Sequence, residues 1–294
     1  MRIPAAYIGM ILITSTTPLA VQWSGEGPGF LFGITSRIVL STILAFLLMS
    51  MLRLPMVWTQ QACQSYLAAG LGVFFSMLAI HWSAQYIPSG WIAVISGLAP
   101  ISTGIMAVVW MNEPSFTAAK LVGIALGIVG LFVIFGQGMM LSKEALYGVG
   151  GMLLAVLSRS ASSVWVKRIH APLNGLVLAA GGLLVATPLF LMLWFASGNA
   201  WPDEIGMRAA ISIIYLAVFV NLLGFVLYLY LLRNIDLTRL ELIALISPVC
   251  ALLLGAQFNN EVISTSVWIG TLMILGGLVC FEFDSKIVQK LINK

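Results

Sequence analysis

The chain has 294 residues, of which 61% are hydrophobic and only 8% are charged, and its formal net charge is +4. A soluble globular protein carries about a quarter charged residues, so this composition excludes a water-soluble surface and predicts that lipid is the solvent for much of the chain. The positive charge does not indicate a nucleic-acid partner, because the basic residues gather in alternate loops.

Ten apolar segments follow one another, each near the length of about 20 residues that a helix needs to cross a bilayer. Their connections carry glycine, proline and asparagine, and none is long enough for a soluble domain. The sequence therefore predicts an all-α integral membrane protein with ten transmembrane helices, forming a single membrane domain over residues 1–294. The expected helices span residues 4–22, 30–51, 64–82, 89–111, 117–136, 145–166, 174–196, 209–231, 238–257 and 264–283.

The N-terminal segment superficially resembles a signal peptide, because Arg2 precedes an apolar stretch to Leu12. The polar run from Thr14 to Thr17 favours an uncleaved transmembrane helix instead.

Lys and Arg residues fall unevenly between alternate loops, and this bias predicts the orientation. With the N-terminus inside, ten of them face the cytoplasm and two, Lys143 and Arg208, face outward, while Arg37 and Arg159 fall within spans. Both termini are therefore expected in the cytoplasm. The inner residues are Arg2, Arg53, Lys120, Lys167, Arg168, Arg233, Arg239, Lys286, Lys290 and Lys294.

Two matching motifs divide the chain into related halves. Pro100 is followed thirteen residues later by Glu113, and Pro248 is followed thirteen residues later by Glu261. The copies are 148 residues apart, and because each half holds five expected helices, the second copy is inverted relative to the first. Inverted repeats are a common architecture of secondary transporters, with the substrate site near the midplane.

The repeated residues also carry a family likeness. The stretches from Ala99-Pro100 through Glu113 to Gly123, and from Ser247-Pro248 through Glu261 to Gly270, resemble the EamA repeat of the drug/metabolite transporter (DMT) superfamily. Arg37 and the segment from Tyr86 to Gly90 fit as well. The likeness covers EamA-like repeat 1 over residues 5–136 and EamA-like repeat 2 over residues 146–283.

The resemblance implies two inverted five-helix repeats in a bacterial inner membrane, and an exporter of amino acids, related metabolites or toxic compounds. One departure lies in the first helix. Many relatives have a tryptophan past its midpoint, where this chain has Thr14-Ser15-Thr16-Thr17.

Two arginines inside spans are the first candidates for a substrate site. An ionisable side chain at a helix centre costs about 2.5–3.5 kcal/mol on insertion scales and usually faces a cavity or a partner. Arg37, in the second expected helix, offers bidentate geometry for a substrate carboxylate. Arg159 lies in a polar patch of the sixth. Snorkelling to the membrane surface is the alternative for both.

Hydroxyl side chains gather in the first and sixth expected helices. Thr14, Ser15 and Thr17 lie in the first, and Ser158 and Ser162 share a face of the sixth. Inversion is expected to place these clusters in opposite halves of the membrane, where they would line two vestibules of one pathway. Interhelical hydrogen bonding is the alternative.

Three more polar residues are candidates for the pathway. His81 and Glu241 are titratable groups suited to proton coupling. A hydrogen-bonded role near the interface is the alternative for His81, and an ion pair with Arg239 is the alternative for Glu241. Asn221, within the eighth expected helix, is the neutral polar candidate.

Aromatic residues and prolines would shape the cavity. Pro100 and Pro248 are expected mid-helix, where proline removes a backbone donor and kinks the helix. The aromatic candidates, for which interfacial belts or packing are the alternatives, are Trp82, Trp91, Trp165 and Tyr228.

Glu113 and Glu261 are expected to be structural. Each follows an asparagine at a helix–helix junction and is suited to cap the next helix or to accept loop amides. Gly123, Gly127 and Gly130 share a helix face, which predicts close helix contact within the bundle or across a homodimer.

The sequence favours a transporter over an enzyme. It holds no HExxH motif and no GxxxxGK[ST] loop, and no metal or cofactor is expected. A channel would lack inverted halves with opposed proline kinks. The predicted function is secondary active export of small metabolites, such as amino acids or aromatic compounds, by alternating access. Efflux of toxic compounds with proton exchange, or a nucleotide- or sugar-type carrier, are the alternatives. The expected partners are a small-molecule substrate and the lipid bilayer.

Overall fold

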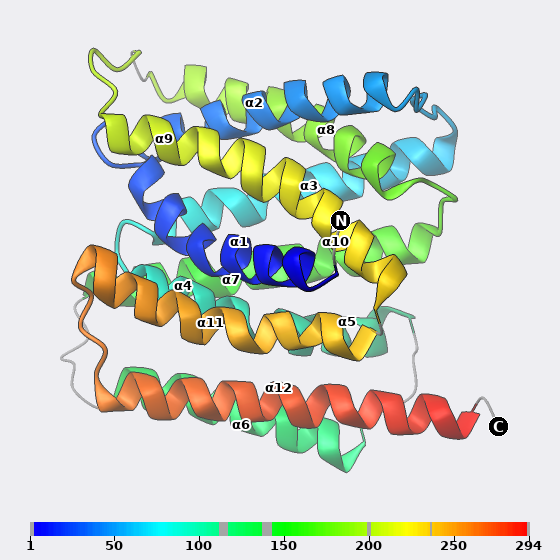
Figure 1. Ribbon diagram of the computed structural model, residues 1–294, viewed down its shortest axis with the longest axis vertical. Helices are drawn as coiled ribbons and strands as arrows, with labels where there is room; N and C mark the ends of the chain where they lie inside the picture. The colour runs from blue at the N-terminus through cyan, green and yellow to red at the C-terminus, as the bar shows by residue number, and fades with distance from the viewer. Residues whose placement is uncertain (1–2, 112–116, 137–142, 199–200, 236, 293–294) are drawn as a thin grey trace.

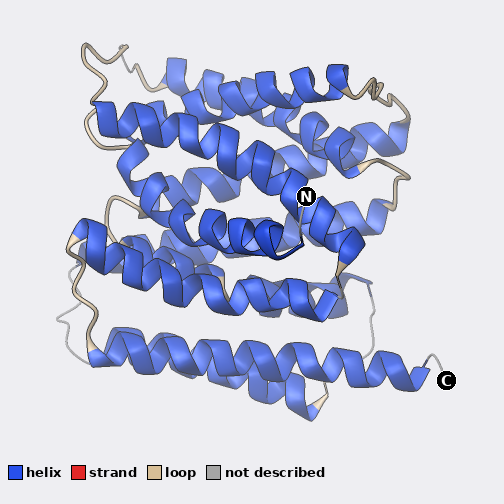
Figure 2. Ribbon diagram, in the orientation of Figure 1, coloured by secondary structure: helices blue, strands red, loops and turns tan. Residues whose placement is uncertain are grey.

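The computed structural model describes residues 3–111, 117–136, 143–198, 201–235 and 237–292. Throughout these residues the regular secondary structure is helical (Figure 2). The helices lie side by side with their axes roughly aligned, so the connections between them gather at two opposite ends of the bundle, at the left and right of Figure 1.

The helices follow the order expected from the sequence. The first half contains α1 (Ile3–Ser24), α2 (Phe30–Met51), α3 (Gln60–Ser83), α4 (Ser89–Ser96), α5 (Ala99–Met111) and α6 (Ala118–Gly136). The second half contains α7 (Lys143–Ile169), α8 (Gly175–Ala196), α9 (Met207–Tyr215), the π-helix η1 (Leu216–Leu223), α10 (Gly224–Asn234), α11 (Leu237–Asn259) and α12 (Thr265–Ile292).

Seven helical stretches in the described residues are long and apolar enough to cross a membrane. One of them joins α4 and α5, and another runs from α9 through η1 into α10. Three shorter apolar stretches accompany them: Ala119–Ile134, Ile243–Asn259 and Thr265–Phe281. The chain is a multi-pass, all-helical membrane protein.

The two repeated prolines differ in their local structure. Pro248 lies inside the continuous helix α11. Pro100 is the second residue of α5, directly after a turn at Gly97 and Leu98 that separates α5 from α4. Proline is tolerated in the first turn of a helix because its missing N–H has no intrahelical partner there. The expected kink at Pro100 is therefore a break between two helices.

Helices from the two halves pack against one another throughout the bundle. The helix α6 lies along α12, while α3 packs against α7 and α8. The helix α1 packs against the stretch α9–η1–α10 and against α11, and α5 packs against α7. The buried centre lies where α1, α3, α4, α7 and η1 meet, around Ile95, Met152 and Leu216.

Glycines bring α6 and α12 into close contact at the bottom of Figure 1. A Cβ atom at Gly123 would lie 2.6 Å from the carbonyl oxygen of Gly277, and one at Gly130 would lie 2.7 Å from that of Gly270. Small residues of this kind let two membrane helices approach closely. The third glycine of the expected face, Gly127, also lies against the bundle, because a Cβ there would lie 3.2 Å from Leu98 and from Ile101. All three glycines thus make contact within the bundle, and a homodimer stays a prediction.

The residue before each repeated proline contacts a hydroxyl from the other half. Thr14 on α1 and Ser247 on α11 share a hydrogen bond of 2.6 Å between their hydroxyls. Ser160 on α7 donates to the backbone carbonyl of Ala99 on α5 at 3.3 Å. The first helix of each half therefore contacts the proline-bearing helix of the other half at the same position.

Candidate functional site

Arg37 lies in the interior of the protein, where its side chain is only 2% exposed. Its Nη2 donates to Oδ1 of Asn221 at 2.9 Å, and Nδ2 of Asn221 donates to the Ser41 hydroxyl at 2.6 Å. Ser41 in turn donates to the backbone carbonyl of Arg37 at 2.7 Å. This chain of hydrogen bonds joins α2 to η1, and we call these three residues the arginine network.

The arginine network leaves part of the guanidinium unpaired. Neither Nε nor Nη1 of Arg37 has a hydrogen-bond partner. A guanidinium has five N–H donors, and a buried charge is costly unless it is paired and hydrogen-bonded. The free donors are therefore suited to an acceptor that arrives with a substrate.

A π-helix positions the asparagine of the network. Asn221 lies in η1, which closes with a bond from the backbone N–H of Gly224 to the carbonyl of Phe219. Such wide turns are rare and frequently mark functional sites. Asn221 is recognisable in the sequence as a polar residue in an apolar run, but nothing in that run signals the π-turn.

Arg159 lies on a face of α7 that is buried at one end and exposed at the other. Met152 and Val156 are buried, whereas Arg159 and Ser163, which continue the same stripe at helical spacing, are exposed. The lipid-facing stripe lies opposite, at Leu154, which is 62% exposed, followed by Leu157 and Trp165. Arg159 therefore lies on the interior stripe of α7 at a place where this stripe is exposed.

The interior stripe of α7 leads toward the arginine network. Val156 belongs to the core cluster against which Val220, the neighbour of Asn221 on η1, packs. Arg159 lies one helical turn beyond Val156.

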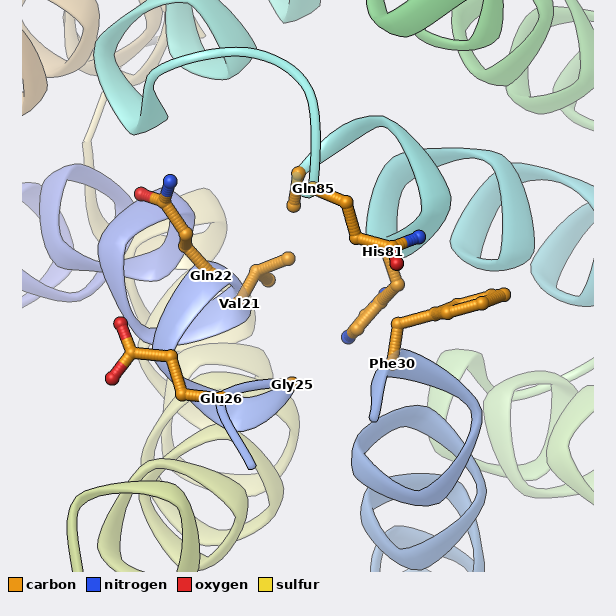
Figure 3. Close-up of a pocket in the computed structure, with 8 residues that line it drawn as sticks. Val21, Gln22, Gly25, Glu26, Phe30, His81 and Gln85 are labelled. Carbon is orange, nitrogen blue, oxygen red and sulfur yellow. The ribbon is translucent and has the colours of Figure 1, made fainter. Parts of the chain in front are cut away.

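His81 lines a cavity of about 210 Å³ at the end of the bundle where α1 and α3 finish and α2 begins. Figure 3 shows its ring reaching between α1 and Phe30, beside Val21 and Gln85. His81 Nδ1 lies 2.9 Å from the carbonyl of Met77, which accepts only, so Nδ1 carries a proton. Nε2 has no partner, and it is the position at which a further proton would bind.

The same end of the bundle is held by a group of paired polar side chains, which we call the polar clasp. Glu261 accepts from the backbone N–H and hydroxyl of Ser89 at 2.9 and 2.7 Å, and from the N–H of Gly90 at 3.1 Å. Asn259 donates to Glu261 and to Gln22, each at 3.1 Å. A carboxylate at a helix N-terminus is stabilising, so the clasp ties α1 and the α11–α12 connection to the start of α4.

The capping role expected for Glu261 thus falls on a different helix. The sequence predicts that Glu261 caps the next helix or accepts loop amides. In the structure it accepts from the N–H groups of Ser89 and Gly90 at the start of α4, in the other half.

Residues 146–282 match the EamA-like transporter family. The second half of the chain is therefore an EamA-like transporter domain. The resemblance noted in the sequence is confirmed, and the matched residues correspond to the second of the two repeats expected there.

Two of three curated relatives of this chain are named as transporters. The uncharacterized transporter YoaV of Bacillus subtilis is 23% identical over 84% of this chain and 85% of its own length. The uncharacterized inner membrane transporter YedA of Escherichia coli is 26% identical over 81% of this chain and 76% of its own length. Protein PecM of Dickeya dadantii is 25% identical over 73% of this chain and 71% of its own.

A solved structure has the same fold. It is titled "Crystal structure of protein", and it superimposes with a TM-score of 0.63 over 97% of each chain at 19% sequence identity. At this identity the likeness concerns the fold alone.

Three of the five hydroxyl residues in the two predicted clusters are hydrogen-bonded within the protein. Thr14 bonds to Ser247, and Thr17 donates to the backbone of its own helix. Ser162 donates to the carbonyl of Ala68 on α3 at 3.0 Å, while Ser158 is partly buried. Ser15 differs, because its hydroxyl is buried and has no partner.

The aromatic candidates are dispersed around the bundle. Trp82 stacks edge-on against Tyr86 with ring centroids 5.0 Å apart, and Trp91 packs among the core residues. Trp165 lies on the lipid-facing stripe of α7, opposite Arg159, and we place it outside the site. Tyr228, on α10 beyond Asn221, is 41% exposed.

Two predicted residues lie outside the described part of the structure. Glu113 falls in the segment 112–116, and the backbone of Glu241 belongs to α11 but its side chain is not described. Their roles stay predictions.

Proposed function

We propose that this EamA-type transporter is a secondary active carrier that exports small metabolites, such as amino acids or aromatic compounds, by alternating access. The membrane is the bacterial inner membrane in this proposal, with both termini in the cytoplasm. The observation that carries the proposal is the buried, partly unpaired guanidinium of Arg37 within a multi-pass bundle.

Matched contacts between the halves support an arrangement of ten spans in two inverted repeats. Gly123 contacts Gly277 and Gly130 contacts Gly270, as expected for two equivalent helices that cross around a two-fold axis. Thr42 and Thr187, on α2 and α8, likewise share a bond of 2.7 Å between the second helices of the two halves. Such a frame is suited to exchanging the conformations of its halves.

The contrast between the two ends supports alternating access. The polar clasp closes the end where α4 begins, while the interior face of α7 is exposed toward its other end, at Arg159 and Ser163. A substrate held by Arg37 would lie between these regions. In the proposed orientation the closed end faces outward and the accessible end faces the cytoplasm.

Reconstitution in liposomes tests the proposal. Radiolabelled amino acids and other metabolites are loaded and their flux is measured, with protein-free liposomes as the control. We expect saturable flux with counterflow, in which unlabelled substrate on the far side accelerates uptake. Flux that never saturates would support a channel instead, and the absence of any protein-dependent flux would contradict the proposal.

Proton exchange is the second candidate function, and Nε2 of His81, which has no hydrogen-bond partner in the cavity beside the clasp, is the position that would take up the proton. Imposing a pH gradient across the same liposomes tests it. Saturable flux that ignores the gradient removes proton coupling and leaves the carrier intact.

The orientation has its own test. Single cysteines are introduced near each terminus after Cys63, Cys250 and Cys280 have been replaced by serine. Both are expected to react with a membrane-impermeant maleimide only after the cell membrane is opened. Termini on opposite sides would rule out two inverted five-helix halves.

A further inference from the structure

Among the side chains that the structure describes, the interior of this transporter holds positive charge without a carboxylate paired to it. Arg37 is 2% exposed and leaves Nε and Nη1 without partners. Arg159 lies on the exposed part of the interior stripe of α7, one turn beyond Val156, which belongs to the core cluster against which Val220 beside Asn221 packs. Two cations in this position repel one another until an anion lies between or beside them.

The carboxylates with described side chains are occupied or distant. Glu26 pairs with Arg208 at 3.4 Å on the surface, and Glu261 belongs to the polar clasp. The remaining three, Glu144, Asp203 and Glu204, are exposed at the start of α7 or in the connection before α9. None of these five carboxylates pairs with either interior arginine.

The neutral acceptors next to Arg37 are also engaged. Oδ1 of Asn221 accepts from Arg37, and its amide nitrogen donates to Ser41. The acceptor oxygen of the Asn221 amide is therefore already bonded to Arg37 and is not directed at a substrate. A substrate ammonium group would meet two like charges here and would find no carboxylate among the described side chains.

We infer that the site between Arg37 and Arg159 selects organic acids, meaning substrates that carry a carboxylate and no ammonium group, over the corresponding amino acids. The inference rests on the proposed transport function and narrows its substrate class. Arg37 holds the carboxylate through charge-assisted hydrogen bonds, and Arg159 adds attraction along the accessible approach.

Matched pairs of ligands test this selectivity. The affinity of each ligand for the purified full-length protein is measured by calorimetry and by thermal shift. Each pair shares one skeleton and differs by a hydroxyl in place of the ammonium: lactate and alanine, phenyllactate and phenylalanine, 2-hydroxyglutarate and glutamate. In the pairs that bind, the hydroxy acid is expected to bind about tenfold more tightly, as fits a charge-assisted contact unopposed by a second cation.

Variants separate the two arginines from general effects on folding. Arg37→Gln is expected to abolish the preference, and Arg37→Lys to retain it with weaker binding. Arg159→Gln, at an exposed position with little risk to folding, is expected to reduce the preference roughly three- to tenfold. Arg168→Gln, in the exposed last turn of the same helix, is the matched control and is expected to change binding less than about twofold.

Several results would overturn the inference. Equal or tighter binding of the amino acid in every pair that binds would do so. Binding only of analogues that lack the carboxylate would also overturn it, as would the absence of binding by all six compounds. A preference for amino acids that disappears in Glu241→Gln would show that a carboxylate completes the site. Saturable flux of another substrate alongside any of these results would leave the proposed transport function standing.

Discussion

The polar clasp and the arginine network are both polar regions inside an apolar bundle, yet they differ in how completely their groups are paired. In the clasp, both carboxylate oxygens of Glu261 accept hydrogen bonds, and Asn259 bonds on both sides. In the network, Arg37 keeps two nitrogens without partners. Fully paired polar groups stabilise one arrangement of helices, whereas unpaired ones are ready for a ligand.

Mutation of Arg37 is expected to affect substrate flux more than stability, whereas mutation of Glu261 is expected to affect conformation more than substrate. Arg37→Gln should lower the flux of carboxylated substrates by roughly 10- to 150-fold, because a hydrogen bond to a charged group contributes about 1.5–3 kcal/mol. Thermal stability should not fall, because the change removes an incompletely paired buried charge. Flux assays and thermal unfolding of the same preparation check this, and an equal loss for neutral substrates would assign Arg37 a structural role.

Asn221→Asp should sharpen the contrast by pairing the arginine from within the protein. The new carboxylate would accept from Arg37 and neutralise it, so carboxylate flux should fall about tenfold or more while thermal stability rises. Asn221→Ala is the control, since it removes the bond without supplying charge and should weaken the apparent affinity only a few-fold. A higher flux in the Asp variant would contradict the role given to the unpaired donors.

Glu261→Gln should act on conformation more than on substrate. The amide keeps the shape of the side chain but loses its charge and one acceptor, which should destabilise the closed end by about 1–3 kcal/mol. A cysteine at Val21, which is 4% exposed and lines the neighbouring cavity, should react faster with an impermeant maleimide in this variant. Unchanged labelling would separate the clasp from gating.

His81→Gln should leave exchange intact and reduce only the response to a pH gradient. Glutamine can still donate to the carbonyl of Met77 but cannot take up a proton. We expect counterflow to change less than about twofold while gradient-driven flux falls several-fold. Loss of both would indicate that His81 is needed for folding or for substrate binding.

The smallest effect is expected at Thr42→Val, which removes a hydroxyl pair in the symmetric frame. Hydrogen bonds between membrane helices average about 0.6 kcal/mol, so thermal stability should fall slightly and flux should stay within roughly threefold. The measurement checks whether a paired hydroxyl outside the arginine network and the polar clasp can be removed with little loss of stability or flux.

The positions of several helices can be predicted from the sequence, whereas the hydrogen-bond partners within the site cannot. Length and apolar composition gave helix positions close to those of α1, α2 and α8, because a span needs about 20 apolar residues. Arg37 and Asn221 were each recognisable as polar residues inside spans. Their contact joins positions 184 residues apart, and no local pattern encodes it.

The same limit applies to Glu261 and Ser162. Glu261 caps a helix of the opposite half, and Ser162 bonds to the backbone of α3 rather than joining Arg159. Local rules correctly indicated that a glutamate after an asparagine caps something and that serines bond between helices. The identity of the partner depends on the packing of distant helices.

The π-helix has a consequence for how such a site arises. Because a π-turn accommodates one residue more than an α-turn, η1 sets the rotation of Asn221 relative to the preceding α9. Deleting Phe219 alone should restore regular winding and rotate the asparagine away from α2 by about 100°. A gain or loss of one codon would thus create or erase the partner of Arg37, a change of register that no single substitution can reproduce.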